Sequence, residues 1–407
     1  MNHLKIYIFF FCLFIFGCQN NATDQYISQT EISIPELLDR NENLWYGKEW
    51  ETTQNAYVHA REAIKVDPIA AEEYLKLAQV FTNEARVTGE HGHYYPSALK
   101  VLDKAITYAD NEDVKFRAMT TKAGVLLSQH EFQQALVLGQ QAVQINPYNS
   151  NVYGVLVDAY VEMGDYENAV KMADKMISVR PDLRSYARVS YLREIYGDVE
   201  GAKEAMRMAV ESGFPSYEQT AWTQLTLGEL YETYGEEDKA LQVYNSILTT
   251  RENYPFAIAA KASIMMGKEK YDEAEKLLQE GIAIIPEVGF YEQLAHIYKK
   301  QNRKEEFNKI VPEIFAMLKD DVYHGHNMNL EYATIYSTLL EDQDKALEYA
   351  MGEYQKRPQN IDVNRMLSMI YFEKNDLLQA GKFAKVAERT GSKHPDLINV
   401  KGLLANK

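Results

Sequence analysis

Cysteine is almost absent from this chain. Its two cysteines, Cys12 and Cys18, both lie near the start of a 407-residue sequence. The remainder therefore offers no disulfide, no thiolate nucleophile and no cysteine-ligated metal site. Proline and glycine are also scarce, with 11 and 21 residues. Because few residues break helices and many favour them, the composition predicts an all-α fold.

Basic residues are also fewer than acidic residues. The chain has 43 lysine and arginine residues against 59 aspartate and glutamate residues, which gives a formal net charge of −16. Such an acidic body repels phosphate backbones, so we expect no nucleic-acid partner. It also repels anionic glycans unless a cation bridges them, so charge gives a glycan partner no support. Basic or neutral partners are favoured.

The short motifs of common enzyme classes are missing. The sequence has no G-x-S-x-G, no G-x-x-x-x-G-K-[ST], no G-x-G-x-x-G and no H-E-x-x-H. Acidic pairs are abundant, but on helices at this density they are better interpreted as solvated faces than as a glycosidase pair. We therefore predict no catalytic residues, no enzymatic activity and no cofactor.

The first residues have the pattern of an export signal. Lys5 supplies a positive start, and Ile6–Phe16 is an unbroken apolar run. This run is shorter than the roughly 20 residues needed to span a bilayer, and it suits the core of a secretory signal. The segment ends in Ile15-Phe16-Gly17-Cys18, which resembles the lipobox of bacterial lipoproteins.

The lipobox resemblance implies that the signal, residues 1–17, is removed and that Cys18 carries the lipid. The alternative is a plain signal peptide or an anchor helix. Residues 18–33 are polar and lack periodicity, so we expect them to form a flexible tether. The resemblance places the protein on a bacterial cell membrane or outer membrane and leaves the membrane face open.

A fixed period runs through the rest of the chain. Tyr160-x3-Gly164-x4-Ala169 recurs as Tyr231-x3-Gly235-x4-Ala240. Small residues at the alanine positions let two helices approach closely, and glycine closes the first helix where a positive φ is needed. Alanines recur 33 or 34 residues apart within one run of three and two pairs of this register: Ala135, Ala169 and Ala202; Ala240 and Ala274; Ala346 and Ala380.

These positions resemble the tetratricopeptide repeat, whose pattern is L-G-x2-Y, then A-x3-F, then P. The resemblance covers residues 34–407 and implies a right-handed superhelical solenoid of helix-turn-helix repeats. The register holds over about nine units, after a leading partial repeat at 34–68. Residues 395–407 are expected to form a C-terminal capping helix, because an uncapped end would expose an apolar face. The repeats are expected at 69–110, 113–147, 150–181, 183–215, 219–253, 255–286, 288–319, 327–358 and 361–392.

Two interruptions of the register each carry the tripeptide H-G-H. Extra residues between Phe81 and Ala98 are expected to form a loop insertion, and the junction after residue 319 is also long. Imidazoles two residues apart on a loop can chelate zinc or copper, although polar loop residues made similar by chance are the simpler interpretation. The histidines are His91, His93, His324 and His326; we expect no metal site and keep them as weak candidates.

The first helices of such repeats line a concave surface. By alignment, eight aromatic or basic residues should lie on or near it, where they could stack on or clamp a peptide or a sugar. Packing between neighbouring helices is the alternative for each. These candidates are Arg184, Arg188, Tyr191, Trp222, Phe256, His296, Arg365 and Phe372.

Three functions compete. The first is a non-catalytic interaction scaffold at the cell envelope, whose partners are other envelope proteins or peptides. The second overlaps with it: an accessory lipoprotein of a polysaccharide-utilisation system, which would organise enzymes or bind glycan. The third, an enzyme, would need a converging polar pocket in the groove. The repeat pattern identifies the fold but does not identify the function, because one fold serves many roles.

Overall fold

The protein is described from a computed structural model, which covers residues 33–406. The chain divides into two units, Met1–Ser33 and Ile34–Lys407. The predicted signal, the lipidated Cys18 and nearly all of the tether lie outside the described residues. Within 33–406 every regular element is a helix, and no helix there is long and apolar enough to cross a membrane.

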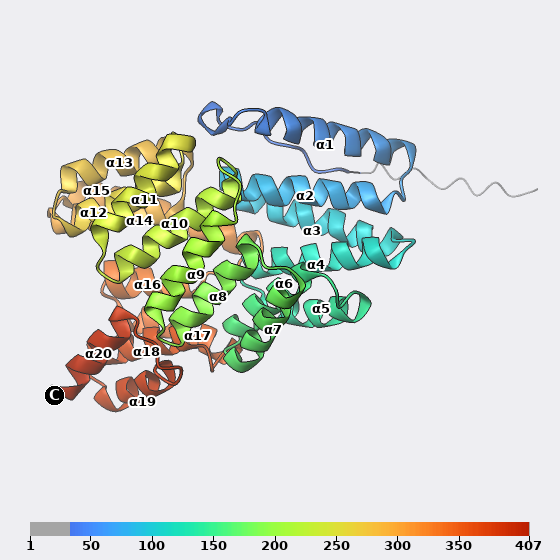
Figure 1. Ribbon diagram of the computed structural model, residues 1–407. Helices are drawn as coiled ribbons and strands as arrows, with labels where there is room; N and C mark the ends of the chain where they lie inside the picture. The colour runs from blue at the N-terminus through green and yellow to red at the C-terminus, as the bar shows by residue number, and fades with distance from the viewer. Residues whose placement is uncertain (1–32, 407) are drawn as a thin grey trace, which may run out of the picture. The chain divides into compact units, whose positions relative to one another are not determined.

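The helices form consecutive antiparallel pairs, and the pairs wind into the right-handed superhelical solenoid that the sequence predicts (Figure 1). An extended segment and the short helix η1 (Glu42–Leu44) precede α1 (Glu49–Val66), and α20 (Pro395–Ala405) caps the C-terminal end. In one pair the first helix, α16, continues as the π-helix η2. The pairs are α2–α3 (Ala71–Thr88, His91–Tyr108), α4–α5 (Glu112–Ser128, Phe132–Ile145), α6–α7 (Ser150–Glu162, Tyr166–Val179), α8–α9 (Leu183–Ile195, Val199–Glu211), α10–α11 (Glu218–Thr233, Glu237–Thr250), α12–α13 (Pro255–Gly267, Tyr271–Ile284), α14–α15 (Val288–Lys300, Lys304–Tyr323), α16/η2–α17 (Asn329–Thr334, Ile335–Leu339, Gln343–Lys356) and α18–α19 (Ile361–Glu373, Leu377–Ala387).

The register alanines lie where the helices approach most closely. All seven are fully buried, because a methyl group is the largest side chain that the close helix crossing accepts. The turn inside each pair needs a left-handed residue. Gly164 (φ +78°) and Gly235 (φ +77°) supply it as predicted, and Gly89 and Gly197 supply it in two further pairs, whereas the remaining five pairs use non-glycine residues. These are His130, Glu269, Asn302, Glu341 and Asn375.

The extra residues between Phe81 and Ala98 do not form a loop. They lengthen α2 to Thr88 and let α3 begin at His91, so the expected loop insertion is wrong. The pair at 288–319 is likewise longer than expected, because α15 continues to Tyr323. Residues in a helix satisfy one another's backbone hydrogen bonds, so a longer helix accommodates extra residues without leaving unpaired backbone groups.

One glycine of the register marks a tight contact inside a pair. A Cβ on Gly228 of α10 would overlap a ring carbon of Tyr244 on α11. The Tyr244 ring is fully buried, and its hydroxyl donates to Glu232 at 2.9 Å, so it has little freedom to retreat. The small residue at 228 is therefore required by packing.

Gly228→Ala is expected to lower the free energy of unfolding by about 1–3 kcal/mol, the usual cost of overpacking a core. Gly124→Ala is the matched control, because the added Cβ would meet nothing within 4 Å. There the change should stabilise α4 by about 0.5–1 kcal/mol through helix propensity. Urea denaturation followed by circular dichroism measures both variants, and equal effects would contradict the packing argument.

The superhelix returns onto itself, so that its later pairs contact its earlier ones. Figure 1 shows the segment ahead of α1 beside α11 and α13, and Asn41 donates to the Ile284 carbonyl at 3.0 Å. Farther along, the Asn327 amide donates to the Gln129 carbonyl at 3.0 Å, and the Ile361 amide donates to the Tyr166 hydroxyl at 2.8 Å. We call this line of contacts the seam. It joins residues 40–49, 84–93, 129–132 and 162–166 to residues 216–218, 251–254, 283–287, 324–327 and 357–361.

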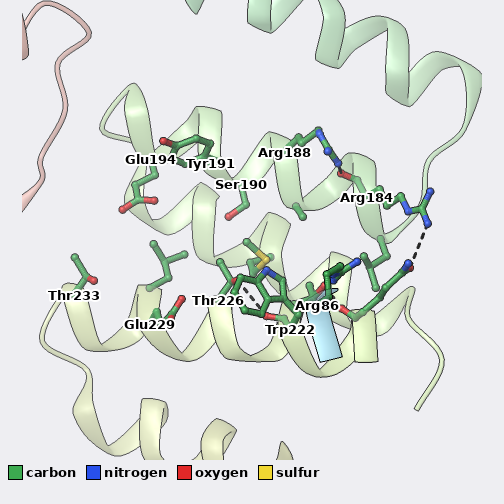
Figure 2. Close-up of a pocket in the computed structure, with 16 residues that line it drawn as sticks. Arg86, Arg184, Arg188, Ser190, Tyr191, Glu194, Trp222, Thr226, Glu229 and Thr233 are labelled. Carbon is green, nitrogen blue, oxygen red and sulfur yellow. Dashed lines mark hydrogen bonds between the residues drawn. The ribbon is translucent and has the colours of Figure 1, made fainter. Parts of the chain in front are cut away.

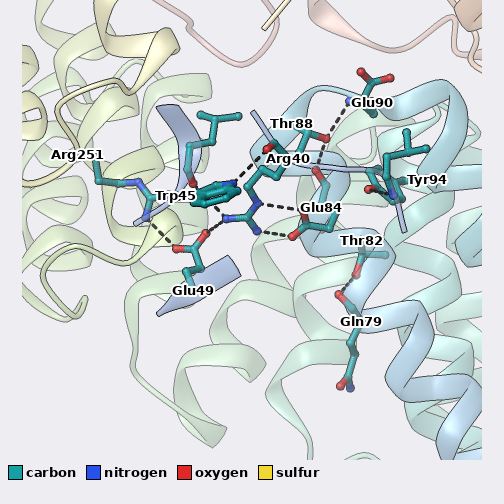
Figure 3. Close-up of polar contacts among 12 residues, drawn as sticks. Arg40, Trp45, Glu49, Gln79, Thr82, Glu84, Thr88, Glu90, Tyr94 and Arg251 are labelled. Carbon is teal, nitrogen blue, oxygen red and sulfur yellow. Dashed lines mark hydrogen bonds and ion pairs between the residues drawn. The ribbon is translucent and has the colours of Figure 1, made fainter. Parts of the chain in front are cut away.

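Buried ion pairs hold the start of the seam. Arg40 donates to both Glu84 oxygens and, at 2.8 Å, to Glu49, whose other oxygen accepts from Arg251 at 3.1 Å across the seam (Figure 3). Arg251 is fully buried and stacks 3.8 Å from the centre of the Tyr46 ring. Burial raises the pKa of Glu84 although Arg40 opposes the shift. The extended segment ahead of α1 is therefore tied to two distant helix pairs.

Candidate binding groove

Two first helices present parallel stripes of polar and aromatic side chains to the inner surface. On α8 the stripe is Arg184, Arg188, Tyr191 and Glu194; on α10 it is Gln219, Trp222, Thr226, Glu229 and Thr233. Residues three or four apart on a helix share one face, so each stripe follows its helix axis. Together they line a groove of about 510 Å³ (Figure 2).

The middle of the groove is aromatic. Trp222 is 44% exposed and Tyr191 is 38% exposed, although both lie on the concave side. Phe256 of α12 stands edge-on to Trp222 with ring centres 5.5 Å apart, and the two line an adjoining cavity of about 440 Å³. A solvent-accessible indole braced by a second ring offers apolar contact area to a ligand at small entropic cost.

One end of the groove is cationic. Arg184 donates to the amide oxygens of Asn151 (3.1 Å, α6) and Gln219 (3.4 Å, α10). Arg188 is neutralised by Asp158 at 2.9 Å, and Arg86 pairs with Glu218 at 2.9 Å. Within the described part of the chain, Arg184 has no carboxylate within 4 Å of its guanidinium. Desolvation, with Arg188 next, lowers the pKa of Arg184, and the more distant charge of Asp182 only partly opposes this shift.

The other end is acidic. Desolvation, with a smaller contribution from Glu232, raises the pKa of Glu229 to about 7. Glu232 accepts hydrogen bonds from Tyr244 at 2.9 Å and from Ser263 at 2.6 Å, and Glu194 accepts one from Tyr234 at 3.2 Å. Burial also raises the pKa of Glu194. The groove is therefore positive at the N-terminal ends of α8 and α10 and negative toward their C-terminal ends.

Comparison with known proteins agrees with the helix-pair architecture. Residues 126–193, from the end of α4 to α8, match the family model described as tetratricopeptide repeat. The chain contains tetratricopeptide repeats.

Two curated relatives carry the same repeats. The chain is 26% identical over 210 residues to the TPR repeat-containing protein YpiA of Bacillus subtilis, which covers 51% of this chain and 48% of the relative. It is 28% identical over 143 residues to the small glutamine-rich tetratricopeptide repeat-containing protein 2 of Saccharomyces cerevisiae, covering 31% of this chain and 40% of the relative. The chain thus spans less than half the length of the curated relatives that it matches.

Solved structures show similar arrangements of helices. The Cut9–Hcn1 hetero-tetramer of the APC/C matches with a TM-score of 0.48 at 13% identity, covering 89% of this chain and 61% of that one. The pilF protein of Pseudomonas aeruginosa matches with a TM-score of 0.41 at 14% identity, covering 58% of this chain and 99% of that one.

The tetratricopeptide repeats bring some of the predicted residues together and separate others. Four of them, Arg184, Arg188, Tyr191 and Trp222, line the groove, and Phe256 lines the adjoining cavity. The remaining three are not among the lining residues of either. His296 lies 3.8 Å from Glu292 on its own helix, Arg365 pairs with Asp362 at 2.8 Å, and Phe372 packs against the cluster under the capping helix.

Several groove residues escaped prediction. Gln219 and Glu229 lie on a first helix, as the predicted residues do, and so does Asn151, which binds Arg184 from α6; their spacing on those helices was the available signal. Arg86 also lies on a first helix, α2, but it reaches the groove across the seam, which the repeat spacing does not predict.

The two H-G-H tripeptides meet at the seam. His91 and His93 lie in the first turn of α3 rather than on a loop, which corrects their expected position, and His324 and His326 follow α15. The rings of His91 and His326 are 6.1 Å apart. Burial lowers the pKa of His91 to about 4 and lowers that of His326 as well.

This meeting point does not form a ligand set in the geometry observed. Over residues 33–406, no three histidine, cysteine, aspartate or glutamate side chains are placed to hold a metal ion. Both ring nitrogens of His326 are buried without a hydrogen-bond partner. His91 and His326 therefore pack into the contact between α3 and the residues after α15, where burial favours their neutral forms.

Proposed function

We propose that this protein is a non-catalytic interaction scaffold whose inner groove binds an extended segment of a partner protein. The observation that carries the proposal is the groove itself, where an exposed Trp222 and Tyr191 lie beside an arginine without a counter-ion. Exposed aromatic and arginine side chains in a concave site are the usual anchors of protein interfaces. The charged ends of the groove favour a peptide over a neutral glycan.

The proposal includes an envelope location. Cys18 of the lipobox-like segment would carry the lipid, and residues 18–33 would tether the solenoid to the membrane. Several acyl chains, at about 0.8 kcal/mol per buried methylene, suffice for stable anchoring. Cys18→Ser is then expected to abolish incorporation of labelled palmitate and to move the protein out of the membrane fraction. Unchanged fractionation and labelling would refute the anchor and leave the groove proposal intact.

The groove proposal is tested by crosslinking in cells. A photoreactive amino acid replaces Tyr191 in the groove or, as the control, Tyr148, which is 84% exposed on the turn between α5 and α6. We expect one or two defined envelope proteins to be captured from position 191 and not from position 148. Capture of the same proteins from both positions, or of none from position 191, would refute the scaffold.

Trp222→Ala should weaken each captured partner's binding by at least tenfold, because about 1.4 kcal/mol or more of apolar contact is removed. The measurement is fluorescence polarisation with the purified partner segment. Circular dichroism of the variant should match that of the parent, since Trp222 is 44% exposed and lies outside the buried core. Binding that is unaffected by this change would place the partner elsewhere on the solenoid.

A further inference from the structure

We infer that the groove selects its partner segment by charge polarity. Resting on the proposed function, the inference is that the bound segment carries a carboxylate and a lysine or arginine about four or five residues apart, with an apolar side chain between them. The carboxylate binds Arg184, the basic side chain binds Glu229, and the apolar side chain contacts Trp222. Each element of this pattern has a counterpart in the geometry of α8 and α10.

The cationic end is built to hold an anion. Arg184 is fixed by Asn151 and Gln219, which are neutral acceptors on the helices to either side. These bonds orient the guanidinium without cancelling its charge, and a pre-oriented guanidinium is suited to bidentate binding of a carboxylate. Arg188 and Arg86 line the same end but already have acidic partners. A carboxylate on the ligand is therefore the counter-ion that Arg184 lacks.

The acidic end of the groove carries a carboxylate without a cationic partner among the described residues. Glu229 points into the groove, and none of the hydrogen bonds or ion pairs of the described residues involves its carboxylate. Desolvation opposes its ionisation, and the nearby charge of Glu232 raises its pKa further. A lysine or arginine of the ligand would relieve this repulsion.

The spacing follows from helix geometry. Arg184 and Glu194 are ten residues apart on α8, as are Gln219 and Glu229 on α10, and a rise of 1.5 Å per residue places the two ends about 15 Å apart. An extended peptide advances about 3.3 Å per residue, so about four or five residues bridge this distance. The aromatic pair Trp222 and Tyr191 lies between the ends and faces the middle of such a segment.

The seam completes the site. Arg86 belongs to α2, far from α8 and α10 in the sequence, and it reaches the cationic end through its ion pair with Glu218. The positive end is thus formed by helices from both sides of the seam, and it is whole only when the superhelix is closed.

The test uses the full chain and four fluorescent decapeptides of the same length. One carries an aspartate and a lysine five positions apart with leucine and phenylalanine between them; the others carry two aspartates, two lysines or two serines at the charged positions. Fluorescence polarisation at low salt and at severalfold higher salt measures their affinities. We expect the peptide with both charges to bind at least about tenfold more tightly than the other three and to weaken in high salt.

Single substitutions test which end of the groove binds which charge of the peptide. Arg184→Gln should remove the contribution of the aspartate alone, and Glu229→Gln that of the lysine alone. Glu229→Lys should shift the preference toward the peptide with two aspartates. Arg61→Gln on α1 and Glu280→Gln on α13, which change the same charges outside the groove, are the matched controls and should leave the ranking unchanged.

The pKa of Glu229 adds a second readout. Because the pKa of this carboxyl is raised to about 7, its attraction for the ligand's lysine is stronger at pH 8 and weakens as the pH falls to 6. Glu229→Gln should reduce this pH dependence, and Glu194, whose pKa burial also raises, accounts for what is left. Binding of all four peptides within about threefold of one another would overturn the polarity and leave the scaffold standing. If none binds, the polarity also falls, and crosslinking from position 191 decides the scaffold separately.

Discussion

Arg357→Ala should lower the stability of the closed superhelix by about 3–5 kcal/mol, the usual cost of removing one partner from a buried ion pair. Arg357 follows α17 and forms ion pairs with Glu353 on that helix and with Glu162 at the end of α6. Its guanidinium also lies 4.6 Å from the centre of the Phe132 ring. One side chain thus joins three helix pairs across the seam.

The reason for the large effect is the charge left behind. The side chain of Glu353 is 1% exposed. Burial opposes its ionisation, yet Arg357 and the bonds from Asn327 and Asn329 together lower its pKa. Without the cation, a buried carboxylate must remain charged at a high cost or take up a proton, so its pKa rises. The deficit of the variant should therefore be larger at pH 8 than at pH 5, because protonation at low pH relieves the buried charge.

Hydrogen exchange measured by mass spectrometry locates this effect. Peptides covering 127–132, 162–166 and 353–361 should exchange faster in Arg357→Ala, while those of α12 and α13 should not. Arg117→Ala is the matched control, since Arg117 forms a partly exposed pair with Glu72 and Asp113 and should contribute no more than about 1 kcal/mol. A loss in Arg357→Ala no larger than this control would mean that the seam contributes little to stability.

Gly164→Ala should open the seam, whereas Gly235→Ala should not. Both glycines occupy the same turn of their helix pairs with nearly equal positive φ angles, so alanine at either site incurs the same backbone cost of about 1–2 kcal/mol. They differ in their surroundings. A Cβ on Gly164 would overlap the backbone carbonyl of Gln359 across the seam, and a Cβ on Gly235 would meet nothing within 4 Å.

Backbone atoms cannot move aside as a side chain can, so the segment around Gln359 must separate from α6 in Gly164→Ala. Small-angle X-ray scattering should show a larger radius of gyration for this variant, and hydrogen exchange should increase at 359–361. Gly235→Ala should show the same loss of turn stability with neither change. If the two variants have the same radius, the seam is not held by this contact.

Much of the architecture was predictable because it is local and repeated. The buried alanines and Gly164 and Gly235 recur at a fixed spacing, and each occurrence supports the others. The left-handed turn position was only partly visible, since Glu269 and Glu341 adopt it against their preference once the two helices beside them are packed. The extra residues near His91 were misassigned as a loop, because the repeat register does not extend to them. They continue the helices on either side, and the register alone cannot distinguish a longer helix from a loop.

The groove was predictable in part. Tyr191 and Trp222 follow from the repeat alignment, because first helices face inward in this architecture. The polarity of the groove was not predictable. It depends on Arg184 having the neutral side chains of Asn151 and Gln219 as its partners instead of a carboxylate, and only the three-dimensional packing shows this. The seam lay beyond sequence reasoning altogether. It results from small rotations summed over several repeats, and no local pattern records that sum.

The seam also sets the order in which the molecule can be completed. Repeat proteins usually fold through contacts between neighbours in the sequence, which is why they form quickly. In this chain Gln129 bonds to His324, and Tyr166 bonds to Ile361, 195 residues apart in each case. The early helices therefore keep one face uncovered until the residues up to about 361 are available to cover it. We expect closure to follow helix pairing as a slower step, because long-range contacts form later than local ones, and chaperones or self-association would compete for the uncovered face at that stage.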